Sequence, residues 1–510
     1  MMKLIYNAKV YLSRDKFAEA VLISGDKIVA TGTNNEIFVA ASAGTEHINA
    51  QGRLLLPGFY DCHQHLEMTG REAAAIPANA SSIDDLIERG QETILRLKPP
   101  SGMFVTGMGW DDGRLGRYPT REDLDKISTE HALVLSRRCG HVICCNTLAL
   151  ERAGINPLAH NGILREKEAE PVWKVIPPAT EKETLAYIRY AVQEVLKNGI
   201  TAVASNDIKG GDIDKFVRVF KELFQEPKLR LRITEQCAIG NEAHLDEYIS
   251  KGYHTGFPLI SDLLKIGPLK LFADGSLGSR TALLRKSYCD EQGTSGVRVL
   301  EQEVLNGYVK KGAENGFQVA IHAIGDGAID AVLSSYEKVT SIKKYLLRHG
   351  ILHCQITDLP LLSRMAGNNI LALIQPIFLS SDQHIVESRV GHELSATSYA
   401  WGTMERLGIR TAYGTDCPVE TPNPLENIAA AVTRYGFFPK EGVDVFTAVD
   451  AYTVGTAYAN FDEQRMGRIK SGMLADLVLL DTDIFSVPVQ EIANTKVLFT
   501  MVGGEMAYIR

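Results

Sequence analysis

Residues 54–67, LLLPGFYDCHQHLE, decide the fold that this sequence predicts. An apolar run passes through Pro57 and Gly58 into a segment that contains His63 and His65. Side chains alternate between the two faces of a strand, so both histidines should lie on one face at its carboxyl end. Two imidazoles placed in this way can hold a metal ion. One such pair among 13 histidines in 510 residues is weak evidence alone, so later parts of the chain must supply further ligands.

The composition is that of a large globular protein with a small-molecule partner. With 45% hydrophobic residues, a chain of this length can bury a large core and should form two or three domains. The net charge of −8 is spread without a basic stripe, which argues against nucleic acid or a membrane surface as partner. A homodimer is one assembly that the sequence allows, and nothing in it decides the oligomeric state.

The N-terminal segment and the cysteines favour a cytoplasmic location. The first 15 residues lack the apolar core and cleavage site of a signal peptide, and no apolar run approaches membrane-spanning length. The eight cysteines include no Cys-x-x-Cys pair and are expected to be reduced thiols. Cys62, Cys354 and Cys417 neighbour candidate site residues, but strand alternation points them away, as small buried residues rather than ligands.

Both ends of the chain are rich in β-forming residues. Neither end can form a core alone, so we expect one small β-sandwich built from residues 1–57 and 464–510. The intervening residues 58–463 should form a separate domain.

Strands and amphipathic helices alternate through this central domain. Seven predicted strands cover residues 200–207, 229–239, 263–274, 318–325, 346–355, 370–378 and 410–419. Together with the opening strand they make eight, which predicts a TIM (β/α)8 barrel with its active site at the carboxyl ends of the strands. Residues 66 to about 180 interrupt the pattern and should form an inserted subdomain over the barrel mouth.

The ends of the later strands supply the groups that the opening strand lacks. These groups are Lys270 and Asp274, His322, His353 and Asp416. Imidazoles and a carboxylate suit zinc, manganese or iron, and zinc is the commonest choice for hydrolysis. A divalent ion lowers the pKa of bound water towards ~7, while a carboxylate can take the proton of that water and pass it to a leaving nitrogen.

Several motifs in this order resemble the amidohydrolase superfamily, in its branch similar to N-substituted formamide deformylases. The resemblance covers nearly the whole chain and includes LLLPGFYDCHQHL, GMGWDD, RRCGHVICCNTLALERAGI, KLFADGSLGSRTALL, IHAIGD, LHCQ and GTDCPVETPNPLENI. The chain departs from this branch in GRLGRYP after GMGWDD, and in the Arg348-His349 that precedes His353. These departures weaken an analogy of substrate.

The resemblance implies a role for each candidate metal ligand. His63 and His65 correspond to the first metal site and His322 and His353 to the second, while Asp416 is both ligand and proton shuttle. Lys270 occupies the position of a carboxylated lysine that bridges two metals in some members, so either one or two ions per chain are expected.

Each assignment also has a structural alternative. A histidine on an apolar strand is often a hydrogen-bonded core residue, Asp416 could cap the next helix, and Lys270 could pair with Asp274. His349 competes with His353 as a ligand.

Further residues are candidates for substrate contact. By the resemblance, His141 faces the substrate and could steady a carbonyl oxygen. Trp110 and Asp111 could form a pocket wall, although Trp110 could equally anchor the packing. Residues 275–281 are permissive enough for a mobile lid. Arg280 within them could bind a substrate carboxylate or pair with Asp274 or Asp290.

The predicted function is that of a metal-dependent amidohydrolase acting on a non-peptide C–N bond, an amide or formamide, in a small molecule. Metal-bound hydroxide would attack the carbonyl, with Asp416 and His141 as catalytic residues. A ring deaminase or cyclic-amide hydrolase on the same scaffold is the nearest alternative. A catalytically silent regulatory relative is a third alternative, but such a relative would typically have lost some ligands.

Overall fold

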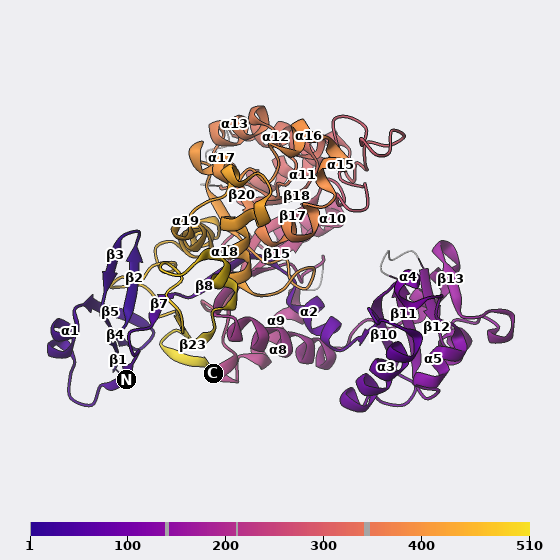
Figure 1. The fold of residues 1–510 in the computed structure, drawn as a ribbon, viewed down its shortest axis with the longest axis horizontal. Coiled ribbons are helices and arrows are strands. Elements are labelled where there is room, and N and C mark those ends of the chain that lie inside the picture. The colour runs from indigo at the N-terminus through magenta and orange to yellow at the C-terminus, as the bar shows by residue number, and fades with distance from the viewer. Residues whose placement is uncertain (1, 138–141, 211–212, 341–346) are drawn as a thin grey trace. The chain divides into compact units, whose positions relative to one another are not determined.

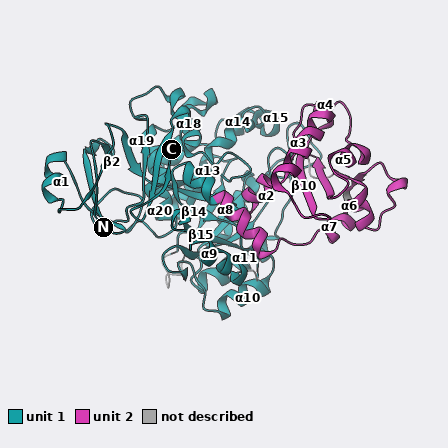
Figure 2. Cartoon of the chain, turned by 90° about the horizontal axis from the view of Figure 1, so that it is seen from below, with its two compact units in different colours: residues 1–66, 192–510 teal, residues 67–191 magenta. Residues whose placement is uncertain are grey.

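The structure is a computed structural model that describes residues 2–137, 142–210, 213–340 and 347–510. The chain divides into two compact units (Figure 2). Unit 1 consists of Met1–Leu66 and Val192–Arg510, and unit 2 of Glu67–Ala191.

A sheet of parallel strands forms the centre of unit 1 (Figure 1). Among the described residues, eight of its strands lie side by side in the order β21-β20-β19-β18-β17-β15-β14-β8, so strands that follow one another along the sheet also follow one another along the chain. Their bounds are Phe59–Gln64 (β8), Ile200–Ser205 (β14), Arg232–Ala238 (β15), Leu264–Phe272 (β17), Val319–Ala323 (β18), Gly350–His353 (β19), Leu371–Ile374 (β20) and Thr411–Tyr413 (β21). A short strand β16 (Pro258–Ile260) pairs antiparallel with β17. The TIM-barrel prediction is confirmed.

Helices follow most of these strands, as parallel neighbours require. Those nearest in chain order are α8 (Glu181–Lys197), α9 (Ile213–Leu223), α10 (Glu242–Ser250), α11 (Gln302–Glu314), α12 (Asp326–Glu337) and α13 (Leu359–Gly367). The C-terminal part of the barrel carries α14 (Leu379–Asp382), α15 (Val386–Val390), α16 (His392–Ser395), α17 (Trp401–Arg406), α18 (Pro424–Thr433), α19 (Val445–Asp450) and α20 (Thr456–Ala459). Throughout the four described ranges, every helix is too short or too polar to span a lipid bilayer.

The first and last strands approach each other through the segment after β21. The Asp416 N–H donates to the His63 carbonyl at 2.7 Å, and the His65 N–H donates to the Cys417 carbonyl at 2.8 Å. A Cβ on Gly414 would lie only 2.6 Å from Asp61 Oδ1, so glycine permits this approach. The barrel is therefore nearly closed at the end where the histidines lie.

The opening stretch forms two strands rather than the single strand predicted. β7 (Leu54–Pro57) belongs to the terminal sandwich, whereas β8 belongs to the barrel. Gly58 separates them, and a Cβ there would lie 2.2 Å from Thr201 Cγ2 of the neighbouring strand. The close approach of β14 thus requires glycine at the point where the chain passes from one sheet to the other.

The two ends of the chain meet in the sheet that contains β7. Its order is β24-β23-β22-β7-β2-β3, with strands Lys9–Ser13 (β2), Lys16–Ala18 (β3), Leu477–Leu480 (β22), Val497–Val502 (β23) and Glu505–Ile509 (β24). A second sheet, β5-β4-β1-β6, contains Met2–Tyr6 (β1), Ala20–Ser24 (β4), Lys27–Gly32 (β5) and Glu46–Asn49 (β6), with helix α1 (Asn34–Ala40) between β5 and β6. Val21, Leu55 and Met501 share one buried core, which confirms the predicted terminal sandwich.

Unit 2 is the inserted subdomain and has its own sheet, in the order β13-β12-β11-β10-β9. Its strands are Ile76–Pro77 (β9), Phe104–Trp110 (β10), Ala132–Arg137 (β11), Val142–Cys145 (β12) and Ile163–Arg165 (β13). The adjoining helices are α2 (Leu66–Ala73), α3 (Ile83–Leu97), α4 (Asp112–Leu115), α5 (Arg121–Ile127), α6 (Thr147–Arg152) and α7 (Glu170–Val175). The predicted position of this subdomain over the barrel mouth stays a prediction.

Candidate metal centre

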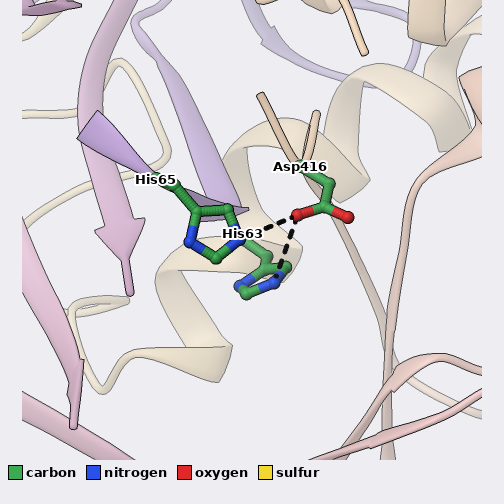
Figure 3. Close-up of side chains that lie close together, drawn as sticks. All are labelled: His63, His65 and Asp416. Carbon is green, nitrogen blue, oxygen red and sulfur yellow. Dashed lines mark ion pairs between the residues drawn. The ribbon is translucent and has the colours of Figure 1, made fainter. Parts of the chain in front are cut away.

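His63, His65 and Asp416 converge at the carboxyl end of the barrel strands (Figure 3). One ligand atom from each lies within 4.8 Å of the others. The Asp416 Oδ1 atom is 3.4 Å from His63 Nε2 and 3.2 Å from His65 Nε2. The imidazole of His63 in β8, that of His65 just after β8 and the carboxylate of Asp416 beyond β21 therefore face a common point.

Hydrogen bonds set the orientation of both imidazoles. His63 Nδ1 lies 2.6 Å from Gln236 Oε1, and the Gln236 amide nitrogen donates to the Cys62 carbonyl, so its oxygen faces the ring. His65 Nδ1 lies 3.2 Å from the Asn206 carbonyl oxygen. Because both partners are acceptors, Nδ1 carries the proton in each ring, and Nε2 faces Asp416 with its lone pair.

His322 at β18 and His353 at the end of β19 extend the cluster. The ring centroids of His322 and His353 are 4.4 Å apart, and those of His63 and His353 are 5.7 Å apart. His353 Nδ1 lies 2.8 Å from Gln375 Oε1, which leaves Nε2 as a ligand atom. His322 differs, since its Nε2 lies 3.0 Å from the Gly275 carbonyl oxygen, and its Nδ1 is the nitrogen available to a metal.

The Lys270 amine is buried beside these imidazoles. Its side chain is 1% exposed, and its Nζ has no hydrogen-bond partner among the residues that the structure describes. Burial lowers the pKa of this amine to about 7. The amine lies 4.2 Å from the centre of the Phe272 ring, and no ion pair with Asp274 is found in the described part of the chain. Lys270 thus presents a buried amine without a hydrogen-bond partner in the described residues, and its charge interacts with the rings of His63, His322 and His353.

Asp61 holds the segment that carries Asp416. Its carboxylate accepts hydrogen bonds from the Thr415 N–H, from the Thr415 hydroxyl at 2.6 Å and from the His63 N–H at 3.0 Å. Asp416 itself has a φ of +56°, a strained value for a residue other than glycine. It does not cap the next helix, because Asn423 caps α18. The Asp416 carboxylate therefore faces the histidine cluster and not a helix end.

The electrostatics and the donor set fit a divalent metal. Burial lowers the pKa of His63 and His353 well below the usual range and that of His322 to about 3, so all three rings are neutral near pH 7. Neutral imidazoles are the form that binds metal. In the described residues, Asp416 Oδ1 has no hydrogen-bond donor, which suits a cation at this point, and Lys270 Nζ has no acceptor.

His349 is a core residue and not part of the cluster. Its Nδ1 accepts the Val319 N–H at 3.0 Å, and its ring stacks on Tyr336 with centroids 4.9 Å apart. Burial lowers its pKa to about 4. Of the two histidines in this segment, His353 therefore faces the site.

The structure does not test the candidate substrate-binding residues of unit 2. Trp110 is fully buried in the core of that unit and donates its indole N–H to the Leu135 carbonyl at 2.9 Å. Asp111 caps helix α4 by accepting the Gly113 N–H. His141 lies outside the described residues. Substrate roles for these three residues stay predictions.

Arg280 is engaged in an ion pair. Its Nε and Nη2 atoms each lie 3.1 Å from a carboxylate oxygen of Asp290, one of the pairings that the sequence allows. A role in substrate binding stays a prediction. The cysteines next to the site residues, Cys62, Cys354 and Cys417, are buried, as expected for small packing residues.

Sequence reasoning missed the residues that orient the histidines. Asn206 and Gln375 directly follow β14 and β20, whereas Asp61 and Gln236 lie within β8 and β15, and all four are at most 4% exposed. A polar side chain within or directly after an apolar strand is the available signal. What it would bond to depends on the register between strands, which the sequence does not display.

Comparison with known proteins supports the chemistry of this site. A model of the amidohydrolase family matches residues 46–508. The putative amidohydrolase YtcJ of Bacillus subtilis (strain 168) is 29% identical, with 96% of each chain covered. The N-substituted formamide deformylase of Arthrobacter pascens is 23% identical, with 99% of this chain and 97% of the relative covered.

A solved structure shares the whole architecture. It is an uncharacterized metal-dependent hydrolase from Pyrococcus furiosus, 29% identical to this chain. The match covers 95% of this chain and 100% of that protein, with a TM-score of 0.82. The fold of this chain is therefore similar to that of a known protein over nearly its whole length.

Proposed function

This chain belongs to the amidohydrolase family, and on that premise we propose that it hydrolyses a non-peptide C–N bond, an amide or a formamide, in a small molecule. The observation that carries the proposal is the convergence of His63, His65 and Asp416 at the barrel mouth. The hydrogen bonds at Nδ1 leave both Nε2 atoms facing Asp416, which supports the proposal.

The residues present define which side chains would hold the metal. His63, His65 and Asp416 would bind a first divalent ion, with zinc as the expected metal. A second ion would be held by His322 Nδ1, by His353 Nε2 and by Lys270 in carboxylated form. A divalent ion supplies Lewis-acid polarisation of a carbonyl group and lowers the pKa of water.

Asp416 is the group suited to move the proton. Its Oδ1 accepts no hydrogen bond from the described residues, and the peptide that carries it is fixed by the bond to the His63 carbonyl. A carboxylate held in this way takes a proton from the attacking water and returns it to the departing nitrogen. Protonation of that nitrogen is the step that a C–N bond requires, because an amide anion is a poor leaving group.

His141 is the proposed donor to the carbonyl oxygen. An imidazole N–H aimed at that oxygen would stabilise the negative charge that develops as the carbonyl is attacked. This part of the proposal rests on the sequence resemblance.

The choice of an amide or formamide is supported by one relative. The Arthrobacter pascens protein, matched over nearly its whole length, is named an N-substituted formamide deformylase. A ring deaminase or a cyclic-amide hydrolase would use the same metal ligands and the same carboxylate, so it is the second candidate. A silent regulatory protein is disfavoured because the described site keeps its imidazoles and carboxylate.

Product analysis separates these candidates. Zinc-loaded protein is incubated with N-substituted formamides, linear amides, cyclic amides and amino-substituted heterocycles, and the products are identified by mass spectrometry. Release of an amine together with formate or a carboxylate is the expected result. Ammonia release from a heterocycle, or ring opening alone, would favour the second candidate. Absence of turnover in every class by fully loaded protein would contradict the proposal.

A further inference from the structure

Asp274 is a buried carboxylate beside the candidate metal centre. It follows β17 and is 3% exposed. Its Oδ1 accepts the Ile324 N–H at 3.1 Å, and its Oδ2 accepts the N–H groups of Gly325 at 2.8 Å and Leu283 at 2.9 Å. The Asp274 side chain therefore connects the end of β17 with the segment after β18 and with the loop that contains Leu283.

The same residue lies against His322. Asp274 Oδ1 is 3.5 Å from His322 Nε2, and the carbonyl of the next residue, Gly275, is 3.0 Å from that nitrogen. Two acceptor oxygens beside Nε2 favour a proton there. The lone pair then lies on Nδ1, in contrast to His63, His65 and His353, in which Nδ1 is hydrogen-bonded.

The surroundings keep Asp274 in this position. The Leu283 carbonyl accepts the N–H groups of Gly327 and Ala328 at the start of helix α12. Leu283 is therefore held by its N–H, which donates to Asp274, and by its carbonyl. A Cβ on Gly325 would lie 2.1 Å from the Leu283 oxygen, which shows how closely these segments pack. Movement of the Asp274 carboxylate would break bonds on each of them.

We propose that Asp274 is a positioning residue that fixes the orientation and the Nε2–H tautomer of His322, and thereby presents Nδ1 to a metal ion. The proposal rests on the proposed function, because it assumes that His322 binds metal. Residues that orient a ligand in this way commonly change metal affinity 10- to 100-fold when replaced.

The experiment measures zinc binding by the metal-free full-length protein, with a competing chelator and with Asp274→Asn. The substitution keeps the shape but sets an NH2 group against backbone N–H donors and removes the charge near His322. We expect zinc affinity at the weaker of the measured sites to fall about 10- to 100-fold. Asp290→Asn is the matched control, because Asp290 lies in the same connecting segment but pairs with Arg280 and Arg389. Its zinc affinity should equal that of the wild type.

A double-mutant cycle separates positioning from general support of the fold. In a His322→Asn background, Asp274→Asn should cause no further loss of zinc affinity, because the ring through which it acts is gone. An equal loss in both backgrounds, or unchanged affinity of Asp274→Asn itself, would overturn the inference. If Asp274→Asn does not fold, Asp274→Glu is titrated instead, and wild-type affinity in that folded variant would also overturn it. Wild-type protein that binds no zinc would instead contradict the proposed function.

Discussion

The backbone N–H of Asp416 donates to the carbonyl oxygen of His63 at 2.7 Å, so the proposed proton acceptor and the first proposed ligand are joined through their main chains. These residues are far apart in sequence and meet because β21 returns to β8. The bond aligns the carboxylate with the imidazoles of His63 and His65. The proposed metal binding and the proposed proton transfer therefore both depend on the closure of the barrel.

Asp416→Asn should abolish most turnover while metal stays bound. The amide keeps one oxygen near the two imidazoles but cannot accept the proton of the attacking water. General-base catalysis contributes about 10²- to 10⁴-fold, so kcat should fall at least ~100-fold. Steady-state kinetics and elemental analysis of the same preparation give both quantities. Normal turnover would exclude Asp416 as the proton shuttle.

Thr415→Val tests the hydrogen bond to Asp61 that holds the segment carrying Asp416. The substitution preserves shape but removes the hydroxyl that donates to Asp61 at 2.6 Å, in a site where burial raises the pKa of Asp61 to about 7. Loss of this bond should cost about 1–3 kcal/mol of unfolding free energy and should also lower kcat.

The control for this variant is Thr500→Val. The Thr500 hydroxyl is also buried, and it donates to the Leu196 carbonyl at the terminal sandwich, away from the metal centre. Urea unfolding should show a comparable stability loss in both variants, with kcat reduced only in Thr415→Val. A kcat reduced equally in both would show that Thr415 acts only through stability.

The metal content should depend on Lys270. We expect two ions per chain and a lysine heavier by one carbon dioxide, because the buried amine has no hydrogen-bond partner in the described residues and its pKa is lowered by burial to about 7. Lys270→Met should reduce the content to one ion. Lys265→Met is the control, since Lys265 is another lysine of β17 but is only partly buried and pairs with Asp462. One ion and an unmodified amine in the wild type would contradict the bridging role.

Much of the barrel was predictable because its signals are local. The run 200–207 contains β14 and the run 370–378 contains β20, since buried parallel strands are continuous apolar segments. The latter run extends past β20 because Pro376 begins a short 3-10 helix, although its residues remain apolar. Hydrophobicity alone does not mark where a buried strand ends.

The ligands of the site were predictable, but their supports were not. His63 and His65 stand out through their spacing. Gln236 and Gln375 are recognisable only when the register brings their amide oxygens to imidazole nitrogens. The shifts in register between β8 and β14 and between β15 and β17 leave no plain pattern in the sequence.

His349 should make the folded protein less stable at acidic pH. Burial lowers its pKa to about 4, against about 6.5 in an unfolded chain. The folded state binds this proton more weakly than the unfolded chain. His349 therefore leaves the free energy of unfolding unchanged above about pH 6.5 and lowers it increasingly as the pH falls towards about 4. At about pH 5 the cost is about 2 kcal/mol.

Urea unfolding of wild type and His349→Gln, at about pH 7.5 and about pH 5, measures this contribution. The Gln side chain can still accept the Val319 N–H but does not titrate. The wild type should therefore lose more stability on acidification than the variant. Equal losses would show that His349 binds its proton as readily in the folded protein as in the unfolded chain.

Gly414→Ala should damage the metal centre without touching a ligand. A Cβ there would lie 2.6 Å from Asp61 Oδ1 and 2.7 Å from the His63 nitrogen, and a backbone atom cannot give way as a flexible side chain does. The segments that carry His63 and Asp416 must separate, at a cost of about 1–3 kcal/mol. Gly278→Ala is the matched control, because its nearest atom would be 3.9 Å away. Metal titration and urea unfolding should show weaker binding and lower stability in Gly414→Ala alone. Wild-type metal affinity in that variant would mean that the His63–Asp416 contact does not set the geometry of the site.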